Sequence, residues 1–405
     1  MNRTTEIAAV AIFAATYLVI AVGKLPGLRL DRAGAALVGA ALMLAAGVLS
    51  VDEAAKAVDL ATLALLLGLM IVVANLRLAG VFRLVNSWVV TGARHPLTLL
   101  ATVALSAGVL SAFLLNDAIC LAMTPLVLDL TRRLRREPVP YLLAVAMAAN
   151  VGSTATITGN PQNILVAGFS GIGYADFAAH LAPVAAIGLV AVVVLIALFH
   201  PGEFFAPARM PEARMPAHLH RPLAVKSVVV TVAMMAALFA GQPPAKAALV
   251  AGGVLLLTRV VRSERIHAAI DWPLLLLFAG LFVVVAGFEK SVLSPPVMQA
   301  IGGVHLERAP VLATVTAVLS NLVSNVPAVL MLKPVLGAAP DAHRAWLIVA
   351  MASTLAGNFT ILGSVANLIV VQGARAGGVA IGFWAYFRVG APLTVLTVLV
   401  GLWWL

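Results

Sequence analysis

The chain is a succession of apolar segments, most of them as long as a helix that crosses a lipid bilayer. These segments cover residues 7–23, 33–50, 60–76, 97–131, 141–170, 178–200, 224–240, 245–260, 271–288, 309–335, 345–371 and 380–405. Because a spanning helix needs roughly 20 apolar residues, the series predicts an all-α membrane protein with about ten to twelve passes. Only 10% of the residues are charged, which is too few to solvate the surface of a soluble protein of this length.

Positive charge is distributed unevenly between the loops and sets the predicted orientation. Most of the 26 Lys and Arg residues fall in six loops, 24–32, 77–96, 131–140, 201–226, 259–265 and 371–388. Lys and Arg accumulate in cytoplasmic loops during insertion, so we place these loops in the cytoplasm. The net charge of +10 then requires no nucleic-acid partner. We expect a multi-pass protein of a bacterial inner membrane, surrounded by lipid.

Residues 97–131 form a segment whose two ends both belong in the cytoplasm. Arg94 precedes the segment and four Arg residues follow it, yet it is too long for one straight crossing. It should therefore enter the membrane, turn and leave by the same face. The turn is predicted near Leu115-Asn116-Asp117, where polar residues interrupt the apolar run. Non-helical backbone at this depth is tolerated only inside protein or beside a cavity.

The two halves of the chain repeat each other. Residues 59–77 match 271–289, LSAFLLNDAICLAMTP matches LSNLVSNVPAVLMLKP, and MAANVGSTATITGNPQNILV matches MASTLAGNFTILGSVANLIV. The distribution of positive charge predicts that residues 59–77 and 271–289 cross the membrane in opposite directions. The repeats are therefore inverted, as in transporters with a site near the midplane. We expect a first repeat over 1–200 with hairpin 97–131 and broken helix 141–170, a cytoplasmic linker over 201–222, and a second repeat over 223–405 with hairpin 309–335 and broken helix 345–371.

Each half also carries a break rich in Gly and Asn. Unwound helix ends offer free N–H groups and carbonyls to an oxyanion, a neutral oxyacid or a cation. No Lys or Arg lies within the two hairpin tips or the two breaks, which favours a neutral or weakly charged ligand. Helix packing by the glycines and structural hydrogen bonding by the tip asparagines are the alternatives. The residues predicted to bind the solute are Asn116, Thr158, Gly159, Asn160, Asn163, Ser324, Asn325, Asn358, Gly363, Ser364 and Asn367.

Asp117 is the one acidic residue deep in an apolar segment. A carboxylate inside a membrane is costly and usually functional. Loss of water at a hairpin tip disfavours the charged form, so we predict that Asp117 carries a coupling proton; a structural cap on the following half-helix is the alternative. Val326 occupies the matching position of the second repeat, so a single proton carrier is expected.

Metal, cofactor and catalytic chemistry are not predicted. The eight His residues lie in loops or at helix ends, and the single cysteine, Cys120, lies in an apolar run. One cysteine allows no disulfide within the chain, and we interpret Cys120 as a packed small hydrophobe. No Gly-x-Ser-x-Gly motif accompanies these residues, so an enzyme is not expected.

Four spaced runs, NDAICLAMTPLVL, ANVGSTATITGNPQNILVAG, SNLVSNVPAVLMLKP and AGNFTILGSVANLIV, resemble the ion transporter superfamily, in particular its arsenite permease and anion permease (citrate transporter-like) branch. The likeness covers nearly the whole chain. It implies an elevator-type transporter, usually dimeric, in which a mobile domain carries the hairpins. Sodium-coupled dicarboxylate members have Ser-Asn-Thr at both tips, whereas this chain has Leu115-Asn116-Asp117 and Ser324-Asn325-Val326, which is more similar to arsenite and silicic-acid exporters.

These observations predict a secondary active transporter, most simply a proton-coupled exporter of a neutral oxyacid such as arsenite or antimonite. A sodium- or proton-coupled transporter of a small anion or carboxylate, and a sodium/proton antiporter, would share the fold. A channel would conduct without coupling. The sequence names neither the substrate nor the coupling ion, and the direction of transport also stays open.

Overall fold

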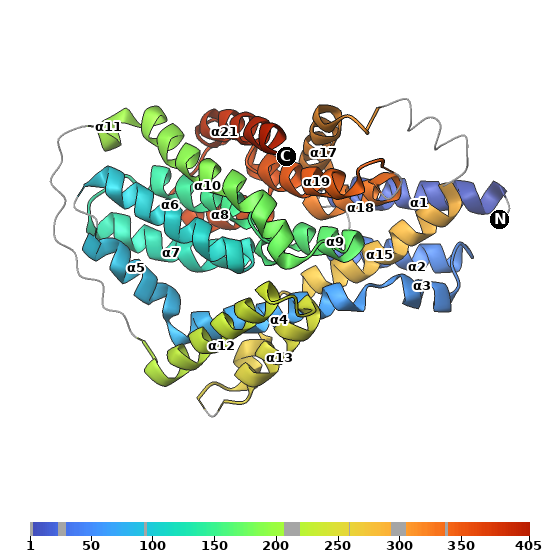
Figure 1. The fold of residues 1–405 in the computed structure, drawn as a ribbon, viewed down its shortest axis with the longest axis horizontal. Helices are drawn as coiled ribbons and strands as arrows, with labels where there is room; N and C mark the ends of the chain where they lie inside the picture. Colours follow the sequence, from blue (N-terminus) through green and yellow to red (C-terminus); the bar gives the residue numbers. More distant parts are fainter. Residues whose placement is uncertain are drawn as a thin grey trace.

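The described part of the protein is built from α-helices joined by short connections (Figure 1). The computed structural model describes residues 3–22, 30–92, 95–205, 219–258, 260–292, 305–336 and 339–405, and within these ranges there is no strand. Seven helices in the described ranges are long and apolar enough to cross a membrane: α1 (Arg3–Val22), α4 (Leu60–Ala79), α6 (Pro96–Phe113), α10 (Tyr174–Phe199), α12 (Arg221–Phe239), α15 (Trp272–Val292) and α21 (Phe383–Trp404).

The remaining described helices do not meet this criterion of length and apolar composition. They are α2 (Arg32–Ala45), α3 (Val51–Ala57), α5 (Val81–Gly92), α7 (Asn116–Arg133), α8 (Pro138–Ser153), α9 (Pro161–Ser170), α11 (Pro201–Phe204), α13 (Pro244–Leu256), α14 (Ser263–His267), α17 (Ala309–Val323), α18 (Asn325–Leu336), α19 (Ala342–Ala356) and α20 (Val365–Ala376).

The two hairpins are α6–α7 and α17–α18. The first turns at Leu114 and Leu115, and the second turns at the single residue Ser324. The turn of the first hairpin lies where the polar interruption predicted it. Helix α6 begins with Pro96, which has no backbone N–H and so adds no unpaired donor at the first helical position.

The two interrupted helices are α8–α9 and α19–α20. Each is broken by one 3₁₀ turn, Ile157–Gly159 in the first and Ile361–Gly363 in the second. Asn160 and Ser364 then cap the following helices by accepting hydrogen bonds from backbone N–H groups. The predicted all-α polytopic fold, with a hairpin and a discontinuous helix in each half, is confirmed. Residues 206–218 of the predicted linker lie outside the described residues.

Helices from opposite halves pack in pairs. α4 of the first half packs against α13 of the second, and α15 of the second packs against α2 of the first. The contacts are made by glycines at matching positions. A Cβ at Gly68 would overlap the backbone of Ala248, and a Cβ at Gly280 would overlap the backbone of Ala36. The glycines that the repeat pairs in sequence thus hold two equivalent helix crossings together.

We expect Gly68→Leu to lower the free energy of unfolding by about 1–3 kcal/mol, because the added side chain has no room at this crossing. Gly253→Leu on α13 is the matched control, since nothing lies within 4 Å of a Cβ at Gly253. Thermal unfolding of both variants in one detergent measures the difference. Equal melting temperatures for the two variants would contradict the assigned crossing.

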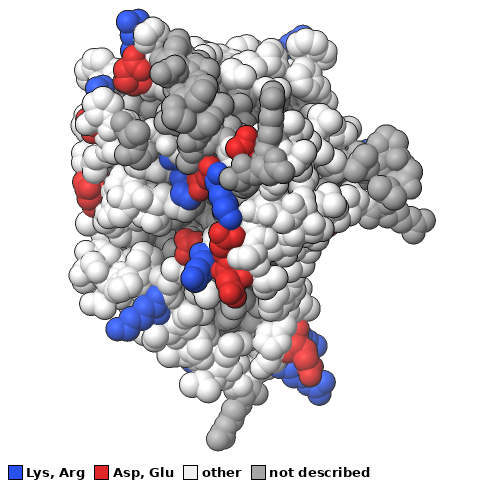
Figure 2. Space-filling view, turned by 90° about the vertical axis from the view of Figure 1, so that its right-hand side faces the viewer, with Lys and Arg blue, Asp and Glu red and all other residues white. Residues whose placement is uncertain are grey.

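Charged side chains are sparse, and several pair near helix ends. Figure 2 shows broad uncharged areas on one face, with Lys, Arg, Asp and Glu gathered in clusters. Arg136 Nε donates to Glu203 Oε1 at 2.7 Å, which ties α7 to α11. Lys290, bonded to Glu53 Oε1 at 2.7 Å, holds the pKa of the Glu53 carboxyl down at about 2. These pairs join elements that lie far apart in the sequence.

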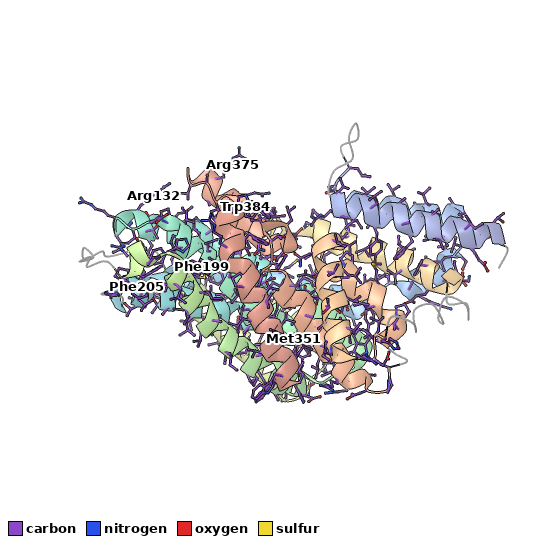
Figure 3. The ribbon with its side chains drawn as sticks, turned by 90° about the horizontal axis from the view of Figure 1, so that it is seen from above. Arg132, Phe199, Phe205, Met351, Arg375 and Trp384 are labelled. Atoms are coloured by element: carbon purple, nitrogen blue, oxygen red, sulfur yellow. The ribbon has the colours of Figure 1, made fainter. Side chains whose placement is uncertain are left out.

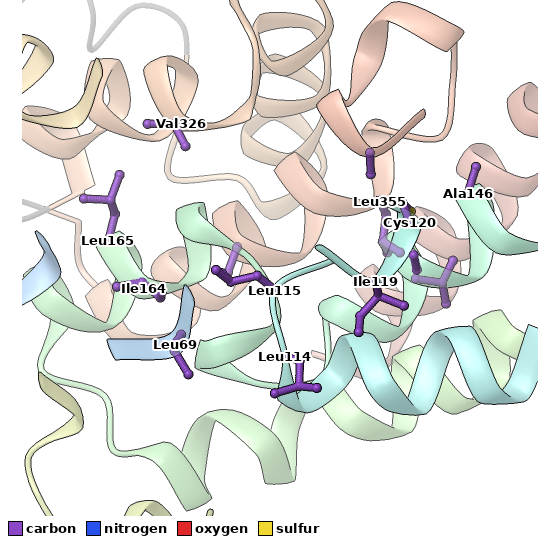
Figure 4. Packing of buried hydrophobic residues seen from close by; sticks show 14 of the residues in the cluster. Leu69, Leu114, Leu115, Ile119, Cys120, Ala146, Ile164, Leu165, Val326 and Leu355 are labelled. Atoms are coloured by element: carbon purple, nitrogen blue, oxygen red, sulfur yellow. The ribbon is translucent and has the colours of Figure 1, made fainter. Parts of the chain in front are cut away.

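The hairpin of the first half packs into the hydrophobic core. Figure 4 shows Leu115 and Ile119 of this hairpin with Cys120 nearby. Cys120 is completely buried, and its Sγ lies 4.0 Å from the carbonyl oxygen of Val145, so its predicted packing role is confirmed. At the other end of α7, Arg132 donates to the carbonyl of Gly377, and Figure 3 shows Arg132 and Arg375 near the same edge of the molecule.

Candidate functional site

Two asparagines hold the interrupted backbone in both halves by the same contacts. Asn163 Nδ2 donates to the carbonyls of Ser153 (3.0 Å) and Thr156 (2.9 Å). Asn367 Nδ2 donates to the carbonyls of Gly357 (2.7 Å) and Thr360 (3.1 Å), which are the matching residues of the repeat. A helix that stops leaves its last carbonyls without partners, and these amides replace the missing N–H groups.

The two breaks are also joined across the repeats through Asn150 of α8. Asn150 Nδ2 donates to Asn358 Oδ1 and Asn367 Oδ1, both at 2.9 Å. Its Oδ1 accepts from Asn116 Nδ2 and Ser364 Oγ, both at 3.1 Å. One fully buried amide therefore connects the first hairpin tip to the second break.

Thr354 of α19 occupies the position of Asn150 in the second repeat and makes the reciprocal contacts. Its Oγ1 accepts from Asn160 Nδ2 and Gln162 Nε2, both at 3.1 Å, and lies 3.4 Å from Asn163 Oδ1. Each half of the chain thus holds the break of the other half. We refer to Asn150, Thr354 and the residues of the two breaks that they contact as the crossed network.

A pocket lies where four helix N-termini meet. The first turns of α7, α9, α18 and α20 all contribute to its lining. Such turns present free N–H groups and the positive end of the helix dipole, so together they favour oxygen atoms that carry lone pairs or negative charge. The polar residues of these turns in the pocket are Asn116, Asp117, Gln162, Ser324, Asn325 and Ser364. Both hairpin tips and both breaks therefore meet at one site, which we call the solute pocket.

Two groups of opposite formal charge line the solute pocket. Arg32 enters from the first turn of α2, and Asp117 lies at the start of α7. Among the described residues, neither side chain has a hydrogen-bond or ion-pair partner. The two tips and the two breaks carry no Lys or Arg, and the guanidinium at this pocket comes from α2.

The second hairpin tip is strained. Ser324 has φ +79°, a left-handed conformation that costs a residue with a side chain about 1–3 kcal/mol. The next residue, Asn325, accepts from Gln162 Nε2 at 3.0 Å and donates to the carbonyl of Gly363 at 3.2 Å when its amide is oriented to satisfy both neighbours. Strain of this kind is concentrated at functional sites, and here it sets Ser324 and Asn325 on the pocket.

The predicted binding residues fall into three groups. Those at the pocket are Asn116, Ser324, Asn325 and Ser364. Those in the crossed network are the completely buried Asn160, Asn163, Asn358 and Asn367, whose side chains are taken up by protein partners. The remaining three residues are Thr158, Gly159 and Gly363. Thr158 Oγ1 lies 2.7 Å from Tyr174 Oη, and a Cβ at Gly159 or Gly363 would collide with the carbonyl of Ser153 or Gly357.

Four residues outside the predicted binding list belong to the site: Gln162 of the first break, Asn150, Thr354 and Arg32. Asn150 lies within one of the repeated blocks, but the matching residue of the other half is Thr354. The two halves therefore share no identical residue at this position. Arg32 lies in a predicted cytoplasmic loop and was attributed to topology. A search for polar residues in the last turn before each break would have found Asn150 and Thr354.

Comparison with known proteins places the chain among transporters. The family model described as "Citrate transporter" matches residues 17–356. An uncharacterized transporter of Mycobacterium tuberculosis, Rv2684, is 30% identical, with 97% of this chain and 96% of that protein covered. The silicon efflux transporter LSI3 of Oryza sativa subsp. japonica is 30% identical, with 94% and 93% covered.

A solved structure shares the fold. The crystal structure of the YdaH transporter of Alcanivorax borkumensis, described as having an unusual topology, superimposes with a TM-score of 0.61. The alignment covers 98% of this chain and 96% of that chain, at 16% sequence identity. The similarity extends over both halves, so the order of hairpins and interrupted helices is not particular to this sequence.

Proposed function

The chain belongs to the citrate transporter family, whose members are secondary transporters, and from this premise we propose that it couples movement of a small oxyacid to movement of a proton at Asp117. The observation that carries the proposal is an acidic side chain without a protein partner among the described residues, at the meeting point of four helix N-termini. A proton is the smallest ligand that such a carboxylate can exchange between two compartments.

The leading substrate is a neutral oxyacid such as arsenite or antimonite, leaving the cell. Its hydroxyl groups both donate and accept hydrogen bonds, and the pocket offers both partners through Asn116, Gln162, Ser324 and Asn325. With Asp117 ionised, its charge and that of Arg32, which lines the same pocket, sum to zero, which suits an uncharged solute. The similarity to a silicon efflux transporter supports an oxyacid. In this scheme the proton binds as the solute leaves, so the two move in opposite directions.

A small anion or carboxylate is the second candidate, and Arg32 is the observation that favours it. When Asp117 is protonated, the guanidinium and the four helix N-termini leave the pocket electropositive. An anion would then bind together with the proton, and both would move in the same direction. The direction of proton movement therefore distinguishes the two candidates.

The moving part is proposed to be the domain built from the hairpins, the interrupted helices, α10 and α21. The crossed network joins the two breaks and the first tip, so these parts would move as one body. The crossed pairs α4–α13 and α2–α15 would form the static scaffold. We also propose a homodimer in a bacterial inner membrane, with 1–200 and 223–405 as the inverted repeats around the linker 201–222.

Transport by the purified protein in proteoliposomes tests the function. We expect arsenite or antimonite to accumulate against its gradient under an imposed pH gradient, and a protonophore to abolish this accumulation. A pH electrode or dye reports the direction of proton movement. Accumulation of citrate with co-moving protons would select the second candidate. Accumulation driven by sodium alone, or equilibration without accumulation, would reject proton coupling.

A further inference from the structure

A second chamber adjoins the solute pocket and shares Asp117 with it. It lies between the hairpin helix α7 and helices α4 and α15, and its lining includes Arg77, Asp117, Leu121, Asp271 and Leu274. Asp117, Pro161 and Leu274 line both cavities. The Asp117 carboxyl is therefore positioned to be reached from two directions.

The two cavities differ in chemistry. The solute pocket carries the neutral donors and acceptors of the tips and breaks. The described lining of the second chamber consists of charged and apolar residues only, with no Ser, Thr, Asn or Gln side chain. An apolar chamber with two carboxylates offers few hydrogen-bond partners to a solute rich in hydroxyl groups. Its two carboxylates can, however, take up and release protons that water carries.

The charged groups around Asp117 come from four helices. Asp271 begins α15 and is exposed, and its Oδ1 accepts from the N–H of Leu274 at 3.1 Å. Arg77 lies in the last turn of α4, and Arg32 lines the solute pocket together with Asp117. Cys120 is the titratable neighbour on α7 itself. In the described lining of this chamber, Asp271 is thus the one exposed carboxylate.

We infer that protons reach and leave Asp117 through the second chamber by way of Asp271, while the solute uses the other pocket. In the forward step the Asp271 carboxyl releases its proton to chamber water, the Asp117 carboxylate takes one up from that water, and Asp271 is reprotonated from the aqueous phase. Proton exchange then does not require an empty solute pocket. The inference rests on the proposed coupling role of Asp117.

Infrared difference spectroscopy of the reconstituted full chain tests this inference without a solute. The carboxyl band of Asp117 is identified as the band lost in Asp117→Asn, and its appearance is followed after a downward pH jump. We expect Asp271→Asn, and Leu121→Trp, which fills the chamber from an exposed position, to slow protonation of Asp117 by an order of magnitude. Leu105→Trp, on the other arm of the hairpin and also exposed, is the matched control and should keep the wild-type rate.

The outcomes separate this inference from the proposed function. Wild-type protonation rates in both Asp271→Asn and Leu121→Trp would overturn the proton route, even if Asp117→Asn abolishes coupling. Full pH-driven transport by Asp117→Asn would overturn the coupling role itself. If Leu121→Trp fails to fold, the exposed Asp271→Asn still decides the question.

Discussion

Asp117→Asn should reduce pH-driven transport to the level of protein-free vesicles while solute binding survives. The amide keeps the shape and hydrogen-bonding capacity of the acid but cannot take up or release a proton. The donors around the solute pocket, which come from the other helix N-termini, are unchanged. Proton flux and solute flux should be followed together in proteoliposomes, and binding should be followed at equilibrium with the solute that the wild type transports.

The matched control is Asp129→Asn on the same helix. Asp129 is about half exposed and pairs with Arg133 one turn away, and exposed pairs contribute little to stability. This variant should transport as the wild type does. Equal coupling in Asp117→Asn and Asp129→Asn would return Asp117 to the role of a structural cap.

The largest effect on stability is expected from Asn150→Leu, which should lower the free energy of unfolding by about 2–5 kcal/mol. The substitution removes one hydrogen-bond partner from each of four buried side chains at once: Asn116, Asn358, Ser364 and Asn367. A single hydrogen bond between membrane helices contributes about 0.6–2 kcal/mol, and here four such losses occur together. Thermal unfolding in detergent, followed by tryptophan fluorescence, measures the effect.

Asn75→Leu is the control for this prediction. Asn75 is also completely buried, but its amide nitrogen bonds only Ile71 O of its own helix, and its oxygen has no partner in the described part of the chain. Removing it should cost little. A melting temperature for Asn150→Leu that matches that of Asn75→Leu would show that the crossed network does not hold the breaks together.

The hairpins and breaks could be predicted because their signals are local. Charge at both ends of 97–131 and the polar residues near Leu115 required a turn there, and the turn lies at Leu114 and Leu115. Matching Gly and Asn residues in the other half then located the second hairpin and both breaks. These signals depend on chain order and charge alone, so no tertiary information was needed.

Which polar residues line the pocket, and which bond other protein groups, could not be predicted in the same way. An irregular segment has no helical period, so its sequence does not show which side chains face a cavity and which face the backbone. Asn163 was predicted to bind the solute, and in the structure its amide nitrogen donates to two carbonyls of its own break. Arg32 reaches the pocket only through the packing of α2, a contact between segments far apart in the chain.

The exchange of helices between the halves has a consequence for how the protein is made. α2 and α4 leave the ribosome long before α13 and α15 exist, so their glycine and alanine faces must at first lie against lipid or against other proteins of the insertion machinery. A chain released after its first half would keep these faces open to unrelated membrane proteins. The two helix crossings therefore cannot form until α13 and α15 have been inserted.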